Sequence, residues 1–292
     1  MEEKGLRRMV LDTDTYNEVD DQFALVYALL SEEVKLEAVY AAPFHNERSS
    51  SPGDGMHRSH EEILRLLDLM GCTGDGFVFK GSDRYMGSLS TPCRNAAVED
   101  LIKKAGKSNP ADPLYVVAIG APTNVASAIT LEPGIMENII VVWLGGNARC
   151  WPRQNEFNQK QDLVASRVLF DSKVRLVQIP CWPVASHLKV SVPELKACMG
   201  DSRIAHDLVG IVDEALHGNL WQTRVIWDIS AVAYVVNPRF MRIHSIHSPV
   251  LCEDMVYALD ETRHWIDCAY YVDRDGIFGD FYKKIHKLPQ VV

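Results

Sequence analysis

Four aspartates lie within ten residues near the start of the chain, namely Asp12, Asp14, Asp20 and Asp21. They follow the apolar run 9–11 and precede the segment 21–30, in which apolar residues recur at helical spacing. This order predicts a strand, a loop that carries the acids, and a helix. Crowded carboxylates repel one another unless a hard divalent cation neutralises them, and oxygen ligands favour Ca²⁺ or Mg²⁺ over zinc. A solvated turn that caps the helix is the alternative interpretation, but a cap needs one aspartate rather than four.

Strand and helix patterns alternate along the rest of the chain. Apolar runs predict strands at 35–42, 77–79, 114–119, 139–144 and 174–179, with closing strands near Val256 and at 269–273. Helical spacing occurs at 61–70, 95–104, 125–129, 192–199, 203–217 and 228–236. Such alternation is typical of an open, mostly parallel α/β sheet with helices on both faces. We expect a single domain over residues 1–292, in which the polar segment 44–59 forms a long loop.

Charge and composition narrow the class of partner. The formal net charge of −9 and the lack of a basic stripe argue against a nucleic-acid partner. No run approaches 18 apolar residues, so we expect no membrane association, and the N-terminal residues lack the apolar core of a signal peptide. The seven cysteines form no CxxC pair, which indicates reduced thiols rather than a disulfide framework. These features predict a cytoplasmic protein that acts on a small molecule.

Five segments together resemble the inosine-uridine-preferring nucleoside hydrolases. The first is Asp12-Thr13-Asp14 followed by Asp20-Asp21, with five intervening residues where the family has three. The other four, in family order, are 120–126 (GAPTNVA), 143–146 (WLGG), 155–158 (NEFN) followed by Asp162, and 225–233 (VIWDISAVA). The resemblance covers residues 9 to about 275 and implies the open α/β fold of the family, a Ca²⁺-centred pocket, and a homodimer or homotetramer.

The resemblance also implies a role for each matching position. Asp14, Asp21, Asp228 and the backbone carbonyl of Thr123 would hold the Ca²⁺, and Asp14 would also act as general base towards a metal-activated water. Asp20 would bind the ribose with Asp12 as a support, and Glu156 and Asn158 would bind the outer sugar hydroxyls. Asn46 and Asn155 are candidates for further substrate contacts, with Asn147 as the alternative to Asn155.

The implied reaction is chemically consistent with these residue types. Cleavage of the N-glycosidic bond of a nucleoside or another riboside passes through a ribosyl cation, which neighbouring carboxylates stabilise. A bound metal lowers the pKa of water and orients the ribose hydroxyls. The resemblance therefore implies hydrolysis that releases ribose and base, and the acid cluster is consistent with it.

Trp227 departs from the family pattern, which has a histidine before this aspartate that protonates the leaving base. An indole N–H is no general acid near neutral pH. Three options follow: Trp227 or Trp221 stacks on the base, another histidine supplies the proton, or the substrate carries a better leaving group. The candidate histidines are His45, His57, His60 and His217, with His45 favoured because its loop follows a predicted strand. Core packing is the simpler interpretation of Trp227.

Two other functions compete with nucleoside hydrolysis. Asp12 and Asp14 after an apolar strand also suit a haloacid-dehalogenase-type phosphatase, with Asp12 as nucleophile and Mg²⁺ as cofactor. That assignment leaves 120–124 and 156–158 unexplained, and Tyr16 stands where a small residue is needed. The second competitor is a riboside-binding relative that kept the sugar and metal site but lost its catalytic acid.

Overall fold

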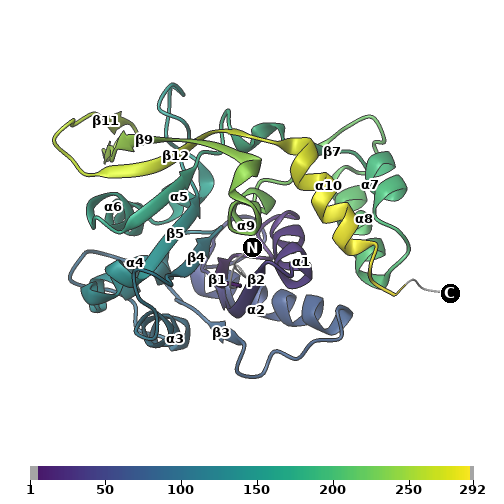
Figure 1. Ribbon diagram of the computed structural model, residues 1–292, viewed down its shortest axis with the longest axis horizontal. Helices are drawn as coiled ribbons and strands as arrows, with labels where there is room; N and C mark the ends of the chain where they lie inside the picture. Colours follow the sequence, from purple (N-terminus) through teal and green to yellow (C-terminus); the bar gives the residue numbers. More distant parts are fainter. Residues whose placement is uncertain (1–5, 290–292) are drawn as a thin grey trace.

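Eight strands form one central sheet in the computed structural model, which describes residues 6–289 (Figure 1). In sheet order they are β3 (Val78–Lys80), β2 (Val34–Ala41), β1 (Arg7–Thr13), β4 (Leu114–Ala118), β5 (Ile139–Leu144), β6 (Arg175–Ile179), β12 (Trp265–Val272) and β9 (Met241–His247). All neighbours are parallel except β9, which runs antiparallel to β12 at one edge. Two small sheets pair β7 (Lys189–Val190) with β8 (Arg224–Val225), and β10 (Val250–Leu251) with β11 (Tyr257–Ala258). Residues 1–5 and 290–292 of the predicted domain lie outside the described residues.

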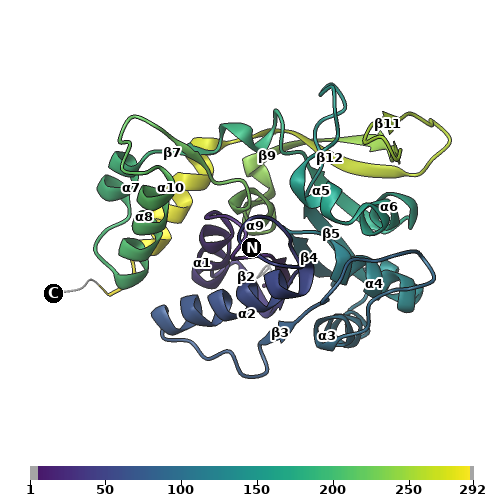
Figure 2. The same ribbon diagram turned by 180° about the vertical axis from the view of Figure 1, so that it is seen from behind.

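Helices cover both faces of the sheet (Figures 1 and 2). One face carries α1 (Asp21–Leu30), α2 (Pro52–Leu69), α9 (Ile229–Val236) and α10 (Arg274–Ile285), with α7 (Val192–Cys198) and α8 (Arg203–Ala215) packed beyond them. The other face carries α3 (Ala96–Ala105), α4 (Thr123–Leu131) and α6 (Leu163–Asp171), and the short α5 (Phe157–Gln161) precedes α6. The predicted fold class, an open and mostly parallel sheet between two helical layers, is confirmed.

The strand order places a crevice beside the acidic loop. β1 lies between β2 and β4. The chain passes from β1 to β2 and β3 on one side of β1, and β4, β5 and β6 then follow on the other side. In open α/β sheets ligands bind where the strand order changes direction, outside the carboxyl ends of the strands. The loop after β1 and the turn after β4, at Gly120, both lie at this point.

Most predicted elements are confirmed to within a few residues, but the segment 44–59 is not a continuous loop. α2 begins at Pro52, nine residues before the predicted start, because the Ser51 side chain caps it by accepting from the Asp54 amide. Gly53 and Gly55 are needed in its first turns, since a Cβ atom would lie 2.7 Å from the Asp83 carbonyl and 2.0 Å from the Phe44 carbonyl. The glycines therefore mark close packing rather than an irregular chain. The sequence patterns also missed β9, α5, α6 and α10.

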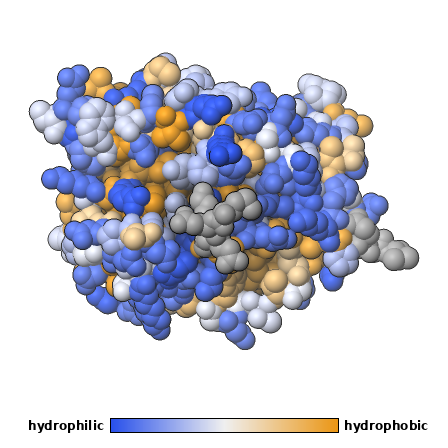
Figure 3. All heavy atoms as spheres, viewed as in Figure 1, coloured by the Kyte–Doolittle hydropathy of each residue, from blue (hydrophilic) through white to orange (hydrophobic). Residues whose placement is uncertain are grey.

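Figure 3 shows hydrophilic residues over much of one face of the molecule, with hydrophobic patches between them. Within residues 6–289, no helix combines the length and apolar character needed to cross a membrane.

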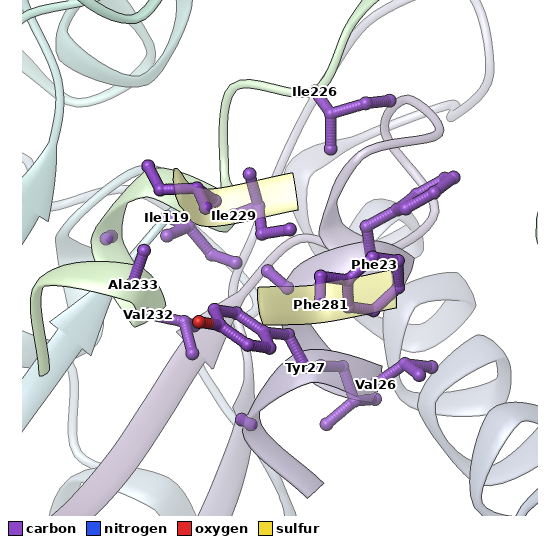
Figure 4. Close-up of a cluster of buried hydrophobic side chains, with 14 of the residues drawn as sticks. Phe23, Val26, Tyr27, Ile119, Ile226, Ile229, Val232, Ala233 and Phe281 are labelled. Atoms are coloured by element: carbon purple, nitrogen blue, oxygen red, sulfur yellow. The ribbon is translucent and has the colours of Figure 1, made fainter. Parts of the chain in front are cut away.

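Aromatic packing fixes α10, the last helix, against α1. The Phe281 ring lies 5.8 Å from the rings of both Phe23 and Tyr27, and all three side chains are fully buried (Figure 4). The Tyr27 hydroxyl donates to Asp280 at 2.6 Å. The amino-terminal helix is thus held by residues more than 250 positions away, which fixes the direction in which α1 leaves the acidic loop.

We expect Phe281→Ala to lower the free energy of unfolding by about 3–5 kcal/mol, because it opens a cavity under α1. Urea denaturation followed by circular dichroism measures the change. Leu89→Ala is the control, since Leu89 is 63% exposed and its truncation should cost under about 0.5 kcal/mol. Equal effects of the two substitutions would contradict this packing.

Candidate active site

Four buried aspartates from three places in the sequence meet at the carboxyl end of β1. Asp14 lies on the loop after β1, Asp20 and Asp21 stand at the start of α1, and Asp228 precedes α9. Carboxylate oxygens of Asp20, Asp21 and Asp228 lie within 4.8 Å of one another, and the three residues form a group that could hold a metal ion. Asp14 is outside this closest group but lines the same cavity. The folded chain therefore brings Asp228 to the amino-terminal acids.

Local hydrogen bonds orient the acids. The Thr13 hydroxyl donates to an Asp21 oxygen at 2.5 Å, and the backbone N–H of Trp227 donates to Asp20 at 3.0 Å. These bonds tie the end of β1 and the segment before α9 to the first residues of α1. Gly120, after β4, makes room for Asp14, because a Cβ atom at this position would lie 2.9 Å from the Asp14 carboxyl carbon.

Burial raises the pKa of every aspartate in the group. The pKa of Asp20 rises to about 8 and that of Asp21 to about 6, mainly through loss of solvent, and the Thr13 hydrogen bond opposes the rise at Asp21. Burial, followed by the charges of neighbouring aspartates, raises the pKa of Asp14 and of Asp228 well above the usual range. Removing water from one carboxylate and placing others beside it both disfavour the charged form.

The candidate ligand atoms, which are carboxylate oxygens, fit a hard divalent cation. Neither carboxylate oxygen of Asp14 has a hydrogen-bond partner among the described residues, although both are buried. Buried oxygens without a partner carry a large free-energy cost, which a coordinated cation removes. All the candidate ligand atoms are oxygens, which is the preference of Ca²⁺ and Mg²⁺.

A cavity of about 330 Å³ opens above the aspartates. Glu156 also lines it and accepts from the backbone amides of Gly146, Asn158 and Gln159 at 2.8–3.0 Å. The Asn158 side-chain amide donates to the carbonyls of Ile119 and Leu144, both at 3.0 Å, which leaves its oxygen for the cavity. Of the residues predicted from sequence, the cavity is lined by Asp14, Asp20, Asp21, Asn155, Glu156, Asn158, Trp227 and Asp228.

Two predicted site residues lie outside this lining. Thr123 is fully buried and its hydroxyl donates to Asp162 at 2.8 Å. The Asn46 side chain donates to the side chain of Asn17 at 2.7 Å, and Asn17, rather than Asn46, lines the cavity. Asn46 therefore supports a residue of the insertion between Asp14 and Asp20 in this structure.

The other candidates for catalysis also lie elsewhere. None of the ten histidines, all within the described residues, lines the cavity, and Trp221 is 81% exposed outside it. Asp12 does not line the cavity, and one of its oxygens accepts from Asn124 at 2.8 Å. That position gives no support to Asp12 as the nucleophile of a phosphatase.

Several lining residues escaped the sequence analysis. They are Asn17, Glu18, Ile119, Leu144, Trp151, Phe157, Cys181 and Trp182. The signal for some of them was present, since Asn17 and Glu18 belong to the five residues between Asp14 and Asp20, where the family has three, and Trp182 follows a strand that ends at Ile179. Asn147 also lines the cavity, but its side-chain amide is used within the loop, where it donates to the Arg153 carbonyl and accepts from the Trp182 amide.

Comparison with known proteins adds sequence and fold similarity to this geometry. A family model described as inosine-uridine preferring nucleoside hydrolase matches residues 9–278. No curated protein sequence matches the chain. One similar solved structure is a plant nucleoside hydrolase, with a TM-score of 0.76 and 18% identity, covering 96% of this chain and 99% of that one. Another is an inosine-guanosine nucleoside hydrolase, with a TM-score of 0.76 and 18% identity, covering 98% of this chain and 100% of that one. A purine-preferring ribonucleoside hydrolase from Gardnerella vaginalis has a TM-score of 0.74 and 21% identity, covering 96% of this chain and 98% of that one.

We expect Gly120→Ala to destabilise the protein by about 1–3 kcal/mol, because the new methyl group meets the Asp14 carboxylate and the Ala42 side chain, which a Cβ atom would approach at 3.2 Å. Thermal or urea unfolding measures the loss. Gly279→Ala is the matched control: no atom lies within 4 Å of a Cβ there, and alanine favours the helix by about 1 kcal/mol. A Gly120→Ala protein as stable as the control would contradict the tight fit around Asp14.

Proposed function

Since the chain belongs to the inosine-uridine preferring nucleoside hydrolase family, we propose that its hydrolysis of ribonucleosides depends on Ca²⁺ and on Asp14 as general base. The family consists of enzymes that hydrolyse nucleosides, so this chain is a nucleoside hydrolase acting on small-molecule substrates. The observation that carries the proposal is the approach of Asp228 to Asp20 and Asp21, with ligand atoms within 4.8 Å.

Ca²⁺ would be held by the carboxylates of Asp14, Asp21 and Asp228 and by the backbone carbonyl of Thr123. The buried acids and the two unpartnered oxygens of Asp14 support the three carboxylates of this set, whereas the Thr123 carbonyl is included because the resemblance to the family implies it. A bound Ca²⁺ supplies charge that lowers the pKa of water and that orients the ribose hydroxyls. Asp20 is assigned to the ribose, as the resemblance to the family implies, and one of its oxygens accepts from the Trp227 amide.

Asp14 would accept the proton of the attacking water, since both of its oxygens lie in the cavity wall without a protein donor. The water oxygen bonds to C1′ as the C1′–N bond breaks, on the face opposite the base. The carboxylates around the cavity stabilise the positive charge that develops on the ribosyl group. Asp20, Asn155, Glu156 and Asn158 would bind the sugar hydroxyls and so fix C1′ near Asp14.

We also propose that the enzyme works in the cytoplasm, in nucleoside salvage, as a homodimer or homotetramer. The seven cysteines are free thiols, which matches a reducing compartment. The exposed aromatic side chains of Trp265, Tyr270 and Tyr271 on β12, beside the sheet edge formed by β9, provide a surface that a second copy could cover.

We expect Asp14→Asn to lower kcat by roughly 10²–10⁴-fold or more, because the isosteric amide cannot accept the proton of water. Ribose release from inosine or uridine, followed by reducing-sugar detection, measures the rate. Asp75→Asn is the control and should keep full activity, because Asp75 is exposed and is not among the residues that line the cavity. Undiminished turnover in folded Asp14→Asn would show that another group is the base.

Calcium should stabilise the folded chain, because only the folded chain brings the acids together. At about 100 times its Kd, a ligand specific for the folded state adds about 2.7 kcal/mol. For a chain of this size this corresponds to a rise in Tm of roughly 5 °C. The rise should disappear in Asp228→Asn and persist in Asp75→Asn, as measured by differential scanning fluorimetry with and without a chelator. An unchanged calcium effect in Asp228→Asn would remove Asp228 from the site.

A further inference from the structure

A short hairpin between β9 and β12 packs against the segments that carry part of the cavity lining. β10 and β11 form this hairpin, which lies beside the edge of the central sheet (Figure 1). The Cys252 amide closes it by donating to the Val256 carbonyl at 3.0 Å, and β10 packs against α6. The Arg167 guanidinium on α6 donates to the Leu251 carbonyl at 2.8 Å. The hairpin is therefore held against the helix that directly follows α5.

Tyr257, on β11, is the hairpin residue that contacts the active-site loops. Its hydroxyl donates to the Gln159 side-chain oxygen at 2.6 Å and accepts from the Gln178 side-chain amide at 3.2 Å. Gln159 is fully buried and Gln178 is 2% exposed, so both depend on protein partners for their hydrogen bonds. The Tyr257 ring packs edge-on against Phe170 of α6, with centroids 5.6 Å apart. The hydroxyl thus acts as donor and acceptor at once, which a phenylalanine could not do.

The Tyr257 hydroxyl contacts both residues that hold one carboxylate oxygen of Glu156. Glu156 Oε2 accepts from the backbone amides of Gly146 and Gln159, at 2.8 and 3.0 Å. A Cβ atom at Gly146 would overlap the Tyr257 hydroxyl oxygen and would lie 2.6 Å from the Gln159 side-chain oxygen. Gly146 has a φ of 67°, a conformation that glycine adopts readily. The hydroxyl therefore lies where it fixes the two amides that orient this oxygen of Glu156.

The turn of the hairpin supports the same loop through its backbone. The Met255 carbonyl accepts from the Gln154 amide at 2.8 Å. The Gln154 side chain in turn accepts from the Asn147 amide at 2.9 Å, directly after Gly146. The hairpin therefore contacts the segment 146–159 at two places, through Met255 and through Tyr257.

The state of Glu156 depends on the amides that this hairpin supports. Burial raises the pKa of Glu156, and the amides of Asn158, Gln159 and Gly146 oppose the rise by donating to the charged form. The charged carboxylate is the stronger acceptor for a sugar hydroxyl, provided that its oxygens are held in a fixed direction. Tyr257 does not line the cavity, so it would influence a substrate only through Glu156.

We propose that Tyr257 is a positioning residue for sugar recognition: it holds Gly146 and Gln159, and these fix the Glu156 carboxylate towards an outer hydroxyl of the riboside. The inference rests on the proposed function, which gives Glu156 that hydroxyl, and it adds the residue that orients Glu156. Tyr257 makes and breaks no bond of the substrate. Loss of its hydroxyl should therefore weaken substrate binding and leave the chemical step nearly unchanged.

Tyr257→Phe tests this role, because it removes only the hydroxyl. With inosine and calcium, KM should rise about 5-fold, as expected for one hydrogen bond, while kcat changes less than about 2-fold. Tyr270→Phe is the matched control: Tyr270 is 55% exposed on β12, and its loss of a hydroxyl should alter neither constant. An unchanged KM in Tyr257→Phe, or a loss confined to kcat, would overturn the proposal.

Ribosides that lack one outer hydroxyl separate positioning from a merely structural role. Tyr257→Phe should lower kcat/KM about 5-fold for inosine, but less than about 1.5-fold for whichever of 3′-deoxyinosine and 5′-deoxyinosine lacks the hydroxyl that Glu156 binds. A structural role would lower kcat/KM for all three substrates alike. Equal losses on inosine and both analogues would therefore overturn the inference.

A double-mutant cycle tests whether Tyr257 acts through Glu156. In the Glu156→Gln background, Tyr257→Phe should lower kcat/KM for inosine by less than about 1.5-fold, whereas fully additive effects would contradict the coupling. Gln159→Met is the second variant, used if Tyr257→Phe does not fold. It removes the acceptor of the same hydrogen bond, keeps the backbone amide, and should show the same dependence on the outer hydroxyl.

Two readouts separate this inference from the proposed function. The rise in Tm with calcium should be the same in Tyr257→Phe as in the unaltered enzyme, because the substitution touches none of the proposed metal ligands. Loss of that rise would mean that the variant disturbs the whole site, which contradicts positioning of Glu156 alone. No ribose from any riboside with the unaltered enzyme would contradict the proposed hydrolysis. Normal cleavage of inosine with equal effects of Tyr257→Phe on the deoxy analogues would overturn this inference alone.

Discussion

The mutual repulsion of four buried aspartates is the constraint on which the rest of the site depends. Asp14, Asp20, Asp21 and Asp228 are all nearly inaccessible to solvent. Burial, followed by the charges of neighbouring aspartates, raises the pKa of Asp14 and of Asp228 well above the usual range. Such a group persists only where the surrounding fold is rigid enough to hold it together. The parallel strands β1 and β4, and the packing of α1 against α9 and α10, provide that rigidity. In the proposed mechanism a bound cation would convert this repulsion into attraction, and the same acids would face a sugar that becomes positively charged.

Periodicity predicted most of the fold, and the crowded aspartates after the first strand predicted a cation site. The assignment of Asp14, Asp21 and Asp228 to that site came from the resemblance to the family. Helices are predicted less well where glycine serves packing: the glycines at 53 and 55 suggested a loop, although each allows α2 to approach another part of the backbone. α10 was missed, although the side chain of Asp273 caps its start by accepting from the Gly276 amide.

The aromatic side of the cavity could not be predicted in the same way. Trp151 and Trp182 lie on separate loops, and their stacking depends on hydrogen bonds from Asn147 and Ala148 that no local sequence pattern specifies. Asn46 matched a family position only loosely, and in the fold it bonds to Asn17, a residue of the insertion. Loops vary more freely than the strands that support them, so the chemistry of acids at strand ends is easier to predict than specificity.

A crystal structure determined in the presence of calcium tests the central claim most directly. The account predicts one strong density peak whose oxygen ligands, at about 2.3–2.6 Å, include the carboxylates of Asp14, Asp21 and Asp228. A peak at another place, or calcium-containing crystals in which these carboxylates lie too far apart to share an ion, would contradict it.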